Sequence, residues 1–529
     1  MNTANIRNGS PFSSPSPVSS LNWLDENRWF WGIQATVILW KVFSAWKLGL
    51  IFDECYYWEW SLHPQACYFD HPPLTAWLIA LGHAILGQNA LAVRVSAILA
   101  GLILALFGRA LAREMFGTSG GNRAGILLTL APIFAGNSFL MTPDSWLITA
   151  WAVAVYFGWK ASRVGGSVIW WMFTGVAAGI GMLSKYTMVL FYVALCGACL
   201  FTSGRRIRLL LGVTLSSIIS LVIFLPVLIW NSSHDWISFQ HQFHHGFRNE
   251  HPGLLINFSN LGEYFLFLLV LVSPVLGIFC FRSATTRLQD ERFRYLASFF
   301  WTVVLLFGFS AAKAHIEANW PMTAFVTGLI MVAGDWQNFK IGWRRLALII
   351  LLLADFGGVV GVSCLSFPGE SPKIPHSFNL ENSWPGDSKG SGALASVILQ
   401  GYSDIELRFE EFRGPRNVAD AIRLEFIHSG ANFLCPSTYQ LYGVLAYYAP
   451  DLEPLLWLPY QGRLRFPWIK YRDWDGKTAL VVSWPRNNTD YHWLFTQLSS
   501  CPPILLEGMR TPVFAAFGKG FRPEMTTDH

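Results

Sequence analysis

Two short runs of the sequence place carboxylates, a histidine and aromatic rings close together. Residues 53–60 read DECYYWEW, and residues 68–74 read YFDHPPL. Asp53 and Glu54 directly follow an apolar segment. Charge at such a boundary is energetically costly, so its presence indicates a function. Partial desolvation by the aromatic rings would tune the basicity of Asp53, so we expect it, with Glu54 beside it, to accept a proton or hydrogen bond from a reacting group. The alternative is that these acids only end the preceding helix.

A further acid follows a proline at the start of another apolar segment. Asp144 lies in the run MTPDS, residues 141–145. Proline and then an acid is also an ordinary helix start, because an acid is favourable at that end of the helix dipole. The functional interpretation rests on topology, since Asp53, Asp70 and Asp144 reach the same membrane face in the arrangement derived below. We therefore take Asp144 as another candidate catalytic residue.

Basic side chains are expected at that face as well. Arg94 opens an apolar segment, Lys185 lies in the run LSKY, and residues 312–321 read AKAHIEANWP. Snorkelling of long side chains explains any one of these cations. Together they suit binding of a lipid phosphate at headgroup depth. The predicted substrate-binding residues are Asp70, His71, Tyr57, Trp58, Arg94, Lys185, Lys313, His315, Glu317 and Asn319.

Histidines are concentrated in one outward segment, which holds five of the 13: His234, His241, His244, His245 and His251. His241 and His245 are spaced to lie on one face of a helix. With Asp70 as a remote ligand they would suit a divalent metal. Hydrogen bonding to a substrate and ordinary solvated polarity are the alternatives, and the sequence indicates no other cofactor.

The composition is that of a membrane protein. Of the 529 residues, 53% are hydrophobic and 13% are charged, whereas soluble proteins carry about 25% charged residues. The net charge of +5 is small and is not gathered into a stripe that would bind nucleic acid. Residues 1–28 are rich in Ser, Pro and Asn, which predicts a disordered cytoplasmic tail.

Apolar segments of about 20 residues predict roughly eleven transmembrane helices. They run approximately over residues 29–51, 93–112, 124–142, 144–159, 167–183, 187–202, 208–230, 261–281, 295–312, 318–335 and 345–366. Every second connection is rich in Arg and Lys, so these connections and the N-terminus are expected in the cytoplasm. The intervening connections and the C-terminal third then face outward. This assignment of alternate connections to the two sides of the membrane requires that residues 72–87 do not cross it. We interpret them as an outer interfacial helix begun by Pro72 and Pro73.

The chain changes character after the last apolar segment. We expect a transmembrane catalytic domain over 29–366 and an outward α/β domain over 367–529. Within the latter, residues 415–428 predict an amphipathic helix closed by Gly430, and strands are expected at 432–435, at 479–484 and near 513–517. The pairs Cys55/Cys67 and Cys435/Cys501 are candidate disulfides if the compartment is oxidising.

These motifs, in this order, resemble the C-type (GT-C) integral-membrane glycosyltransferases. The similarity rests on Asp53-Glu54 with Tyr57-Trp58, the run 68–73, Thr142-Pro143-Asp144 and Leu183-Ser184-Lys185. It covers residues 29–366 and extends into 432–449. The nearest branch is glycosyltransferase family 83, which contains the bacterial lipid A aminoarabinose transferases and is related to protein O-mannosyltransferases.

The resemblance implies an undecaprenyl-phosphate (polyprenyl-phosphate) sugar donor, inversion at the anomeric carbon, and transfer on the periplasmic side of the bacterial inner membrane. It makes Asp53 and Asp144 the two essential loop acids. Asp70-His71 stands where the aminoarabinose transferases carry Glu-Lys, and that lysine helps to bind the donor phosphate. In this chain His71, Lys185 or the histidine segment would bind the donor phosphate instead. The sequence does not decide whether the sugar is aminoarabinose, a hexose, a hexosamine or a uronic acid.

The identity of the acceptor is also undecided: it is lipid A, another glycolipid or envelope glycan, or a protein hydroxyl. Other functional classes would show different patterns. A lipid-linked sugar transporter or flippase keeps its ionisable residues near the bilayer midplane and has repeated halves, whereas the charges here lie at helix ends and no repeat is evident. A purely structural or signalling membrane protein would have no pocket near Asp53 and Asp144.

Overall fold

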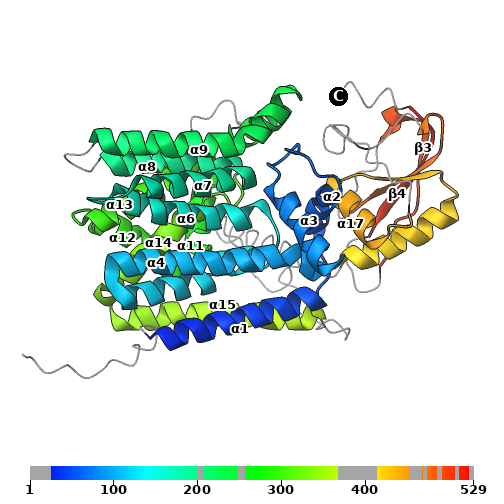
Figure 1. Cartoon of the computed structure of the whole chain (residues 1–529). Coiled ribbons are helices and arrows are strands. Elements are labelled where there is room, and N and C mark those ends of the chain that lie inside the picture. Colours follow the sequence, from blue (N-terminus) through cyan, green and yellow to red (C-terminus); the bar gives the residue numbers. More distant parts are fainter. Residues whose placement is uncertain are drawn as a thin grey trace, which may run out of the picture.

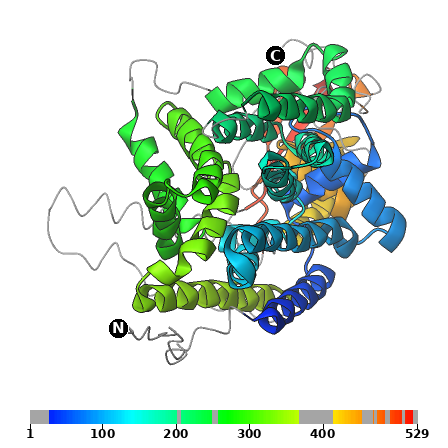
Figure 2. The same ribbon diagram turned by 60° about the vertical axis from the view of Figure 1, so that its left-hand side comes forward.

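The computed structural model describes residues 26–200, 206–247, 256–366, 414–452, 468, 474–484, 491–506 and 512–522. It consists of a body of long helices that run side by side, with a small sheet and its covering helices at one end (Figure 1). Figure 2 shows the helical body turned toward the viewer. The helical body holds the apolar segments, and the small sheet belongs to the C-terminal part of the chain.

The helices of the body follow one another with short connections. Their bounds are α1 (Asn27–Lys47), α2 (Phe52–Leu62), α3 (Leu74–Leu86), α4 (Ala90–Leu130), α5 (Pro132–Asn137), α6 (Pro143–Ser162), α7 (Val168–Ser184), α8 (Leu190–Leu200), α9 (Arg206–Ser232), α10 (Ile237–Phe247), α11 (Phe258–Val270), α12 (Pro274–Thr286), α13 (Glu291–Ala311), α14 (Met322–Asp335) and α15 (Ile341–Ser366). Single 3₁₀ turns cover Tyr186–Val189 and Trp336–Asn338.

The helix α4 is two antiparallel arms rather than one rod. Gly117 has a φ of 79°, which only glycine adopts without strain, and the chain reverses there. Arg109 Nε on the first arm donates to Asn122 Oδ1 on the second at 2.9 Å. A Cβ at Gly121 would lie 2.8 Å from Arg113 Cβ, so the arms touch through glycine. The two arms correspond to the separate apolar segments predicted at 93–112 and 124–142.

Three described helices, α4, α9 and α13, are long and apolar enough to cross a membrane by themselves. Two bent pairs, α1 with α2 and α11 with α12, pass the same test as pairs, and the bend between α1 and α2 is 79°. The protein is a multi-pass membrane protein, but the predicted count of about eleven spans stays a prediction. The segment predicted as one span over 261–281 is broken, because the chain turns at residues 271–273 between α11 and α12.

The acidic motif lies on a helix, which corrects the expectation of a loop. α2 begins at Phe52 and has Asp53 and Glu54 in its first turn, where acids are favourable to the helix dipole. The segment predicted as an outer interfacial helix over 72–87 is also helical, as α3. The connection between α2 and α3 carries Asp70 and His71.

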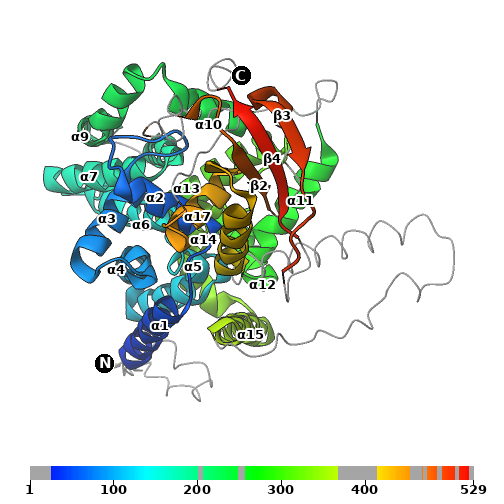
Figure 3. The same cartoon turned by 90° about the vertical axis from the view of Figure 1, so that its right-hand side faces the viewer.

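The C-terminal part contains a four-stranded sheet in the order β1-β2-β4-β3. Its strands are β1 (Phe433–Pro436), β2 (Ala479–Ser483), β3 (Phe495–Ser500) and β4 (Phe514–Phe521). β1 and β2 are parallel, and β4 runs antiparallel to both β2 and β3. A 3₁₀ turn covers His492–Leu494, and helices over 414–429 and α17 (Tyr439–Tyr448) pack beside the sheet (Figure 3). The predicted helix at 415–428 and all three predicted strands are present, and the described cysteines are free thiols.

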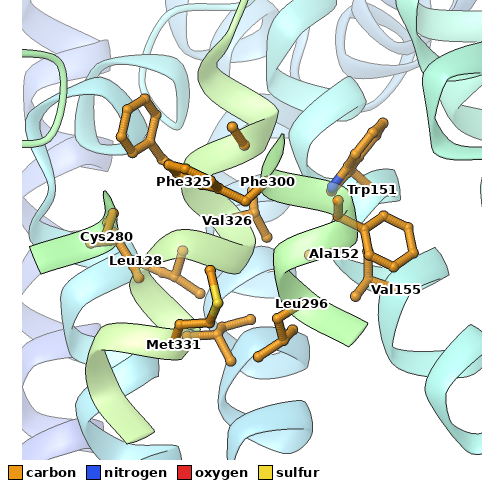
Figure 4. Packing of buried hydrophobic residues seen from close by; sticks show 14 of the residues in the cluster. Leu128, Trp151, Ala152, Val155, Cys280, Leu296, Phe300, Phe325, Val326 and Met331 are labelled. Carbon is orange, nitrogen blue, oxygen red and sulfur yellow. The ribbon is translucent and has the colours of Figure 1, made fainter. Parts of the chain in front are cut away.

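The core of the helical body surrounds α14, which is apolar on every side and therefore buried nearly throughout. Figure 4 shows Phe325, Val326 and Met331 of α14 among side chains from the helices α4, α6, α12 and α13. Trp151 and Phe300 in this cluster have no exposed surface. This rigid packing fixes the ends of the helices that carry the candidate site.

Candidate active site

A cavity of about 1160 Å³ opens where the helical body meets the C-terminal sheet. Polar side chains from distant parts of the sequence line it, together with apolar residues of α8, α10 and α13. The predicted site residues among its walls are Asp53, Tyr57, Asp70, His71, Asp144, Lys185, His241, Glu317 and Asn319. The predictions, made from separate segments of the sequence, thus converge on one cavity.

Asp144 is held by two side chains in the cavity wall. Lys185 Nζ lies 2.7 Å from Asp144 Oδ1, and Asn319 Nδ2 donates to Asp144 Oδ2 at 2.7 Å. Asp144 is in the first turn of α6, while Lys185 directly follows α7 and Asn319 precedes α14. Ser184 Oγ donates to the Pro143 carbonyl at 2.6 Å and ties the ends of the two helices together. Both carboxylate oxygens of Asp144 therefore already accept strong hydrogen bonds.

Asp53 is an exposed acid of the cavity lining, as is Glu317. It lines the cavity from the first turn of α2 and is exposed, whereas Asp70 and Asp144 are buried. The sharp bend between α1 and α2 brings Asp53 to the cavity. An exposed carboxylate facing a cavity is accessible to a substrate group.

The neighbouring acid, Glu54, points away from the cavity. It forms an ion pair with Arg94, and neither side chain has any exposed surface. Arg94 Nε donates to Glu54 Oε1 at 2.8 Å, and its other nitrogens donate to Glu54 Oε2 and to the carbonyls of Leu48 and Gly49. The Met141 amide also donates to Glu54 Oε1 at 3.1 Å. The pair thus links α2 and α4 to the end of α1 and to the segment before α6. Glu54 and Arg94 therefore hold these helices in position and do not line the cavity.

Asp70 is tied to α10. Tyr56 Oη donates to Asp70 Oδ2, and His241 Nε2 lies 3.2 Å from Asp70 Oδ1. Gln242 Nε2 donates to the Asp70 carbonyl at 2.6 Å. The described residues contain no group of three or more His, Cys, Asp or Glu side chains placed to hold a metal ion. Because the side chain of His245 lies outside the described part, the metal site predicted from His241, His245 and Asp70 stays a prediction.

His71 is a histidine of the cavity wall whose pKa is shifted by its surroundings. Burial lowers the pKa of His71 from 6.5 to about 4, and the nearby Lys185 charge acts in the same direction. Asp70 and Asp144 oppose this shift without cancelling it. His71 is therefore neutral at pH 7, and of the residues suggested for phosphate binding Lys185 is the lysine of the cavity wall, where it pairs with Asp144.

Four predicted residues do not belong to the cavity lining, in addition to Glu54. Arg94 is buried as described, and Trp58 is buried against Tyr447 with ring centroids 4.9 Å apart. Lys313 Nζ lies over the Phe309 ring, 4.5 Å from its centroid. His315 is exposed and its Nδ1 lies 3.3 Å from Glu263 Oε2.

The C-terminal part supplies cavity residues that the sequence interpretation did not name as site residues. Thr438, Tyr439, Gln440 and Trp484 line the cavity from the C-terminal part of the chain. Tyr439 packs on Tyr56 with ring centroids 4.5 Å apart, and Trp484 stacks on Phe52 at 5.0 Å. The signal available beforehand was the family resemblance of residues 432–449, to which no role was attached.

The chain is similar in sequence to known glycosyltransferases. Residues 70–230 match a family model described as dolichyl-phosphate-mannose-protein mannosyltransferase. The chain is 25% identical over 378 residues to the lipid A galacturonosyltransferase RgtD of Rhizobium johnstonii, which covers 69% of this chain and 77% of that protein. It is 29% identical over 165 residues to the undecaprenyl phosphate-alpha-4-amino-4-deoxy-L-arabinose arabinosyl transferase of Pseudomonas paraeruginosa, over 30% of each protein.

The fold is shared with a solved structure over nearly the whole chain. ArnT from Cupriavidus metallidurans bound to undecaprenyl phosphate matches with a TM-score of 0.62 and 17% identity, covering 94% of this chain and 98% of ArnT. Its apo structure gives a TM-score of 0.59. The predicted GT-C fold and the predicted resemblance to membrane glycosyltransferases are confirmed.

Proposed function

We propose that this protein is an inverting glycosyltransferase that moves a sugar from undecaprenyl phosphate, or a related polyprenyl phosphate, to lipid A or another glycolipid. The observation that carries the proposal is the cavity itself, which brings the exposed carboxylate of Asp53 and the Lys185–Asp144 pair to one end of a multi-pass helical body. A relative named as a lipid A galacturonosyltransferase and another named as an undecaprenyl phosphate-aminoarabinose transferase support it. We place the protein in the bacterial inner membrane, with its N-terminus in the cytoplasm and the cavity and the domain 367–529 in the periplasm.

The donor would lie along the side of the cavity formed by the helical body. Leu190, Leu306 and Phe307 line that side and provide apolar surface for the first part of a polyprenyl chain. Lys185 follows on the same side, where its ammonium group would bind the lipid phosphate by charge-assisted hydrogen bonds. Since a phosphate is already stable as an anion, its departure needs little acid catalysis, and a fixed cation suffices to stabilise the growing charge.

Asp53 would act as the general base for the acceptor. Its carboxylate takes the proton of the acceptor hydroxyl while that oxygen attacks the anomeric carbon from the face opposite the phosphate. The bond between the anomeric carbon and the phosphate oxygen breaks, and its electron pair leaves with the phosphate. One displacement of this kind inverts the anomeric configuration. Asp144 would hold Lys185 and Asn319 in place around the donor.

A uronic acid is our first candidate for the sugar. The resemblance to RgtD extends over 69% of this chain, whereas the resemblance to the aminoarabinose transferase extends over 30%. Asp70-His71 also departs from the Glu-Lys of the aminoarabinose transferases. A protein acceptor is the second candidate, favoured by the match of residues 70–230 to the protein mannosyltransferase model.

Transport of a lipid-linked sugar fits the structure less well. A transporter keeps its ionisable groups near the bilayer midplane, where alternating access requires them. Here Asp53, Asp144 and Lys185 lie at helix ends, in a cavity that the C-terminal part helps to enclose.

Mass spectrometry of lipid A from cells with and without an intact gene tests the proposal. We expect lipid A from the mutant to lack one sugar, with a mass difference that identifies it. A complementary reaction uses purified protein, lipid A and undecaprenyl phosphate carrying either galacturonic acid or 4-amino-4-deoxy-L-arabinose. Unchanged lipid A in cells together with no transfer in vitro would rule out lipid A as the acceptor.

A further inference from the structure

We propose that Gln440, on the C-terminal α17, recognises the acceptor by hydrogen bonds to its sugar hydroxyls. This inference rests on the proposed function and assigns acceptor recognition to the C-terminal part of the chain. Gln440 lines the cavity and is half-buried. In the described part of the chain its side-chain amide makes no hydrogen bond, while the neighbouring Thr438 hydroxyl already caps α17 by accepting from the Leu441 amide at 3.2 Å. A half-buried amide facing a cavity is therefore available to a ligand.

The position of Gln440 is fixed relative to the helix that carries the general base. α17 packs directly on α2, because Gly443 allows the two backbones to meet: a Cβ at Gly443 would lie 2.8 Å from the Tyr56 amide nitrogen. Tyr448 Oη donates to the Leu50 carbonyl at 3.0 Å and fixes the other end of α17. Gln440 thus belongs to the wall that α2 and α17 build together, the same wall that carries Asp53.

The part of the cavity lining that comes from the helices other than α2 and α17 has the features that suit the donor. Lys185 and the apolar side chains of Leu190 and Phe307 come from the helical body. With the donor placed there, the acceptor hydroxyl must enter between the donor and Asp53, which is the space that α17 borders. The division of the cavity into two walls is what assigns Gln440 to the acceptor rather than to the donor.

The chemistry of the side chain defines what it can recognise. A primary amide offers two donor hydrogens and one acceptor oxygen and carries no charge, so it suits the hydroxyls of a sugar ring better than a phosphate. The inferred ligand class is therefore the hydroxylated sugar head group of a glycolipid such as lipid A. Loss of one or two such hydrogen bonds weakens binding by about tenfold.

The test compares Gln440→Met, which keeps the length of the side chain, with Gln497→Ala as a surface control. Gln497 is an exposed glutamine on β3 outside the cavity lining. Binding of lipid A and of undecaprenyl phosphate is measured for the detergent-solubilised full chain, and KM values follow from transfer assays. We expect Gln440→Met to weaken lipid A binding and raise the KM for lipid A about tenfold, with undecaprenyl phosphate binding unchanged and with Gln497→Ala like wild type.

The outcomes separate this inference from the proposed function. Equal affinity of wild type and Gln440→Met for lipid A overturns the role of Gln440, and so does an equal loss of undecaprenyl phosphate binding. Absence of lipid A binding to the wild type overturns it as well. Failure of the wild type to transfer sugar, despite differential lipid A binding by the two proteins, contradicts the proposed function alone.

Discussion

The ammonium of Lys185 lies 2.7 Å from one carboxylate oxygen of Asp144, and the amide of Asn319 occupies the other. This arrangement separates the roles of the acids around the cavity. A carboxylate whose two oxygens already accept hydrogen bonds from protein groups has less capacity left to accept one from a substrate. Glu54 is engaged in the same way by Arg94. Asp53 is the exposed acid of the three, and we propose that it is the one that exchanges a proton with a substrate.

Replacing Asp53 with Asn should abolish transfer without affecting folding. Loss of a general base lowers the rate by about 10²- to 10⁴-fold, while an exposed side chain contributes little to stability. Transfer rates and thermal unfolding are measured for Asp53→Asn and for Asp475→Asn, an exposed aspartate outside the cavity lining. Full activity of Asp53→Asn would refute its assignment as the base.

Replacing Lys185 with Met should weaken donor binding. A hydrogen bond from a charged group is worth about 1.5–3 kcal/mol, so we expect undecaprenyl phosphate to bind roughly 10- to 100-fold more weakly. The matched control is Lys313→Met, because Lys313 lies over Phe309 and outside the cavity lining. If the two variants lose affinity equally, general attraction of lipid phosphate to basic residues explains the binding and Lys185 has no special role.

Breaking the buried pair of Glu54 and Arg94 should destabilise the protein. Removing one partner of a buried ion pair leaves the other charge without compensation and costs about 3–5 kcal/mol. We expect Glu54→Gln to unfold at a clearly lower temperature than wild type. Glu114→Gln serves as control, since Glu114 makes a partly exposed pair with Lys160 at 4.0 Å, and such pairs contribute about 1 kcal/mol or less. Equal unfolding temperatures for the two variants would contradict a positioning role for Glu54.

The low pKa of His71 makes stability depend on pH. In the folded protein it takes up a proton near pH 4, whereas in the unfolded chain it does so near pH 6.5. As pH falls from about 6.5 to about 4, the unfolded state binds the proton and the folded state does not, so stability is lost across that window. We expect the unfolding temperature of wild type to fall more steeply over this range than that of His71→Asn.

The exposed His428 provides the control for this measurement. His428→Asn should retain the pH dependence of the wild type. A pH profile of His71→Asn that matches wild type would show that His71 is not held neutral by the fold.

The sequence predicted where the helices and strands lie better than it predicted where a helix is interrupted. Apolar length located most helices of the body, and alternation of basic connections brought Asp53, Asp70 and Asp144 to a common end. The break at residues 271–273 was missed, because hydropathy averages over Ser273 and Pro274 within an otherwise apolar run. The helical character of α2 was also missed, since its aromatic residues have only moderate helix propensity and tertiary packing decides the outcome.

The candidate site was predicted residue by residue, but not its pairings. From their residue types, Glu54 and Arg94 could either bind a substrate or form a structural ion pair. Only the fold shows that they form a buried ion pair with each other. The contribution of α17 could not be predicted, because its contact with α2 joins segments almost 400 residues apart. Pairings between distant segments depend on packing that composition and spacing do not encode.

Glu59 shows how the two parts of the molecule depend on each other. It is buried on α2, where Tyr442 Oη and Trp468 Nε1 donate to its Oε1 at 3.4 and 3.3 Å, and His63 Nε2 lies 3.5 Å from the same oxygen. A chimera that exchanges only the C-terminal part with that of a relative would leave this carboxylate facing a foreign surface. An exchange of the C-terminal part between such proteins must therefore move α2 together with α17 to keep these hydrogen bonds.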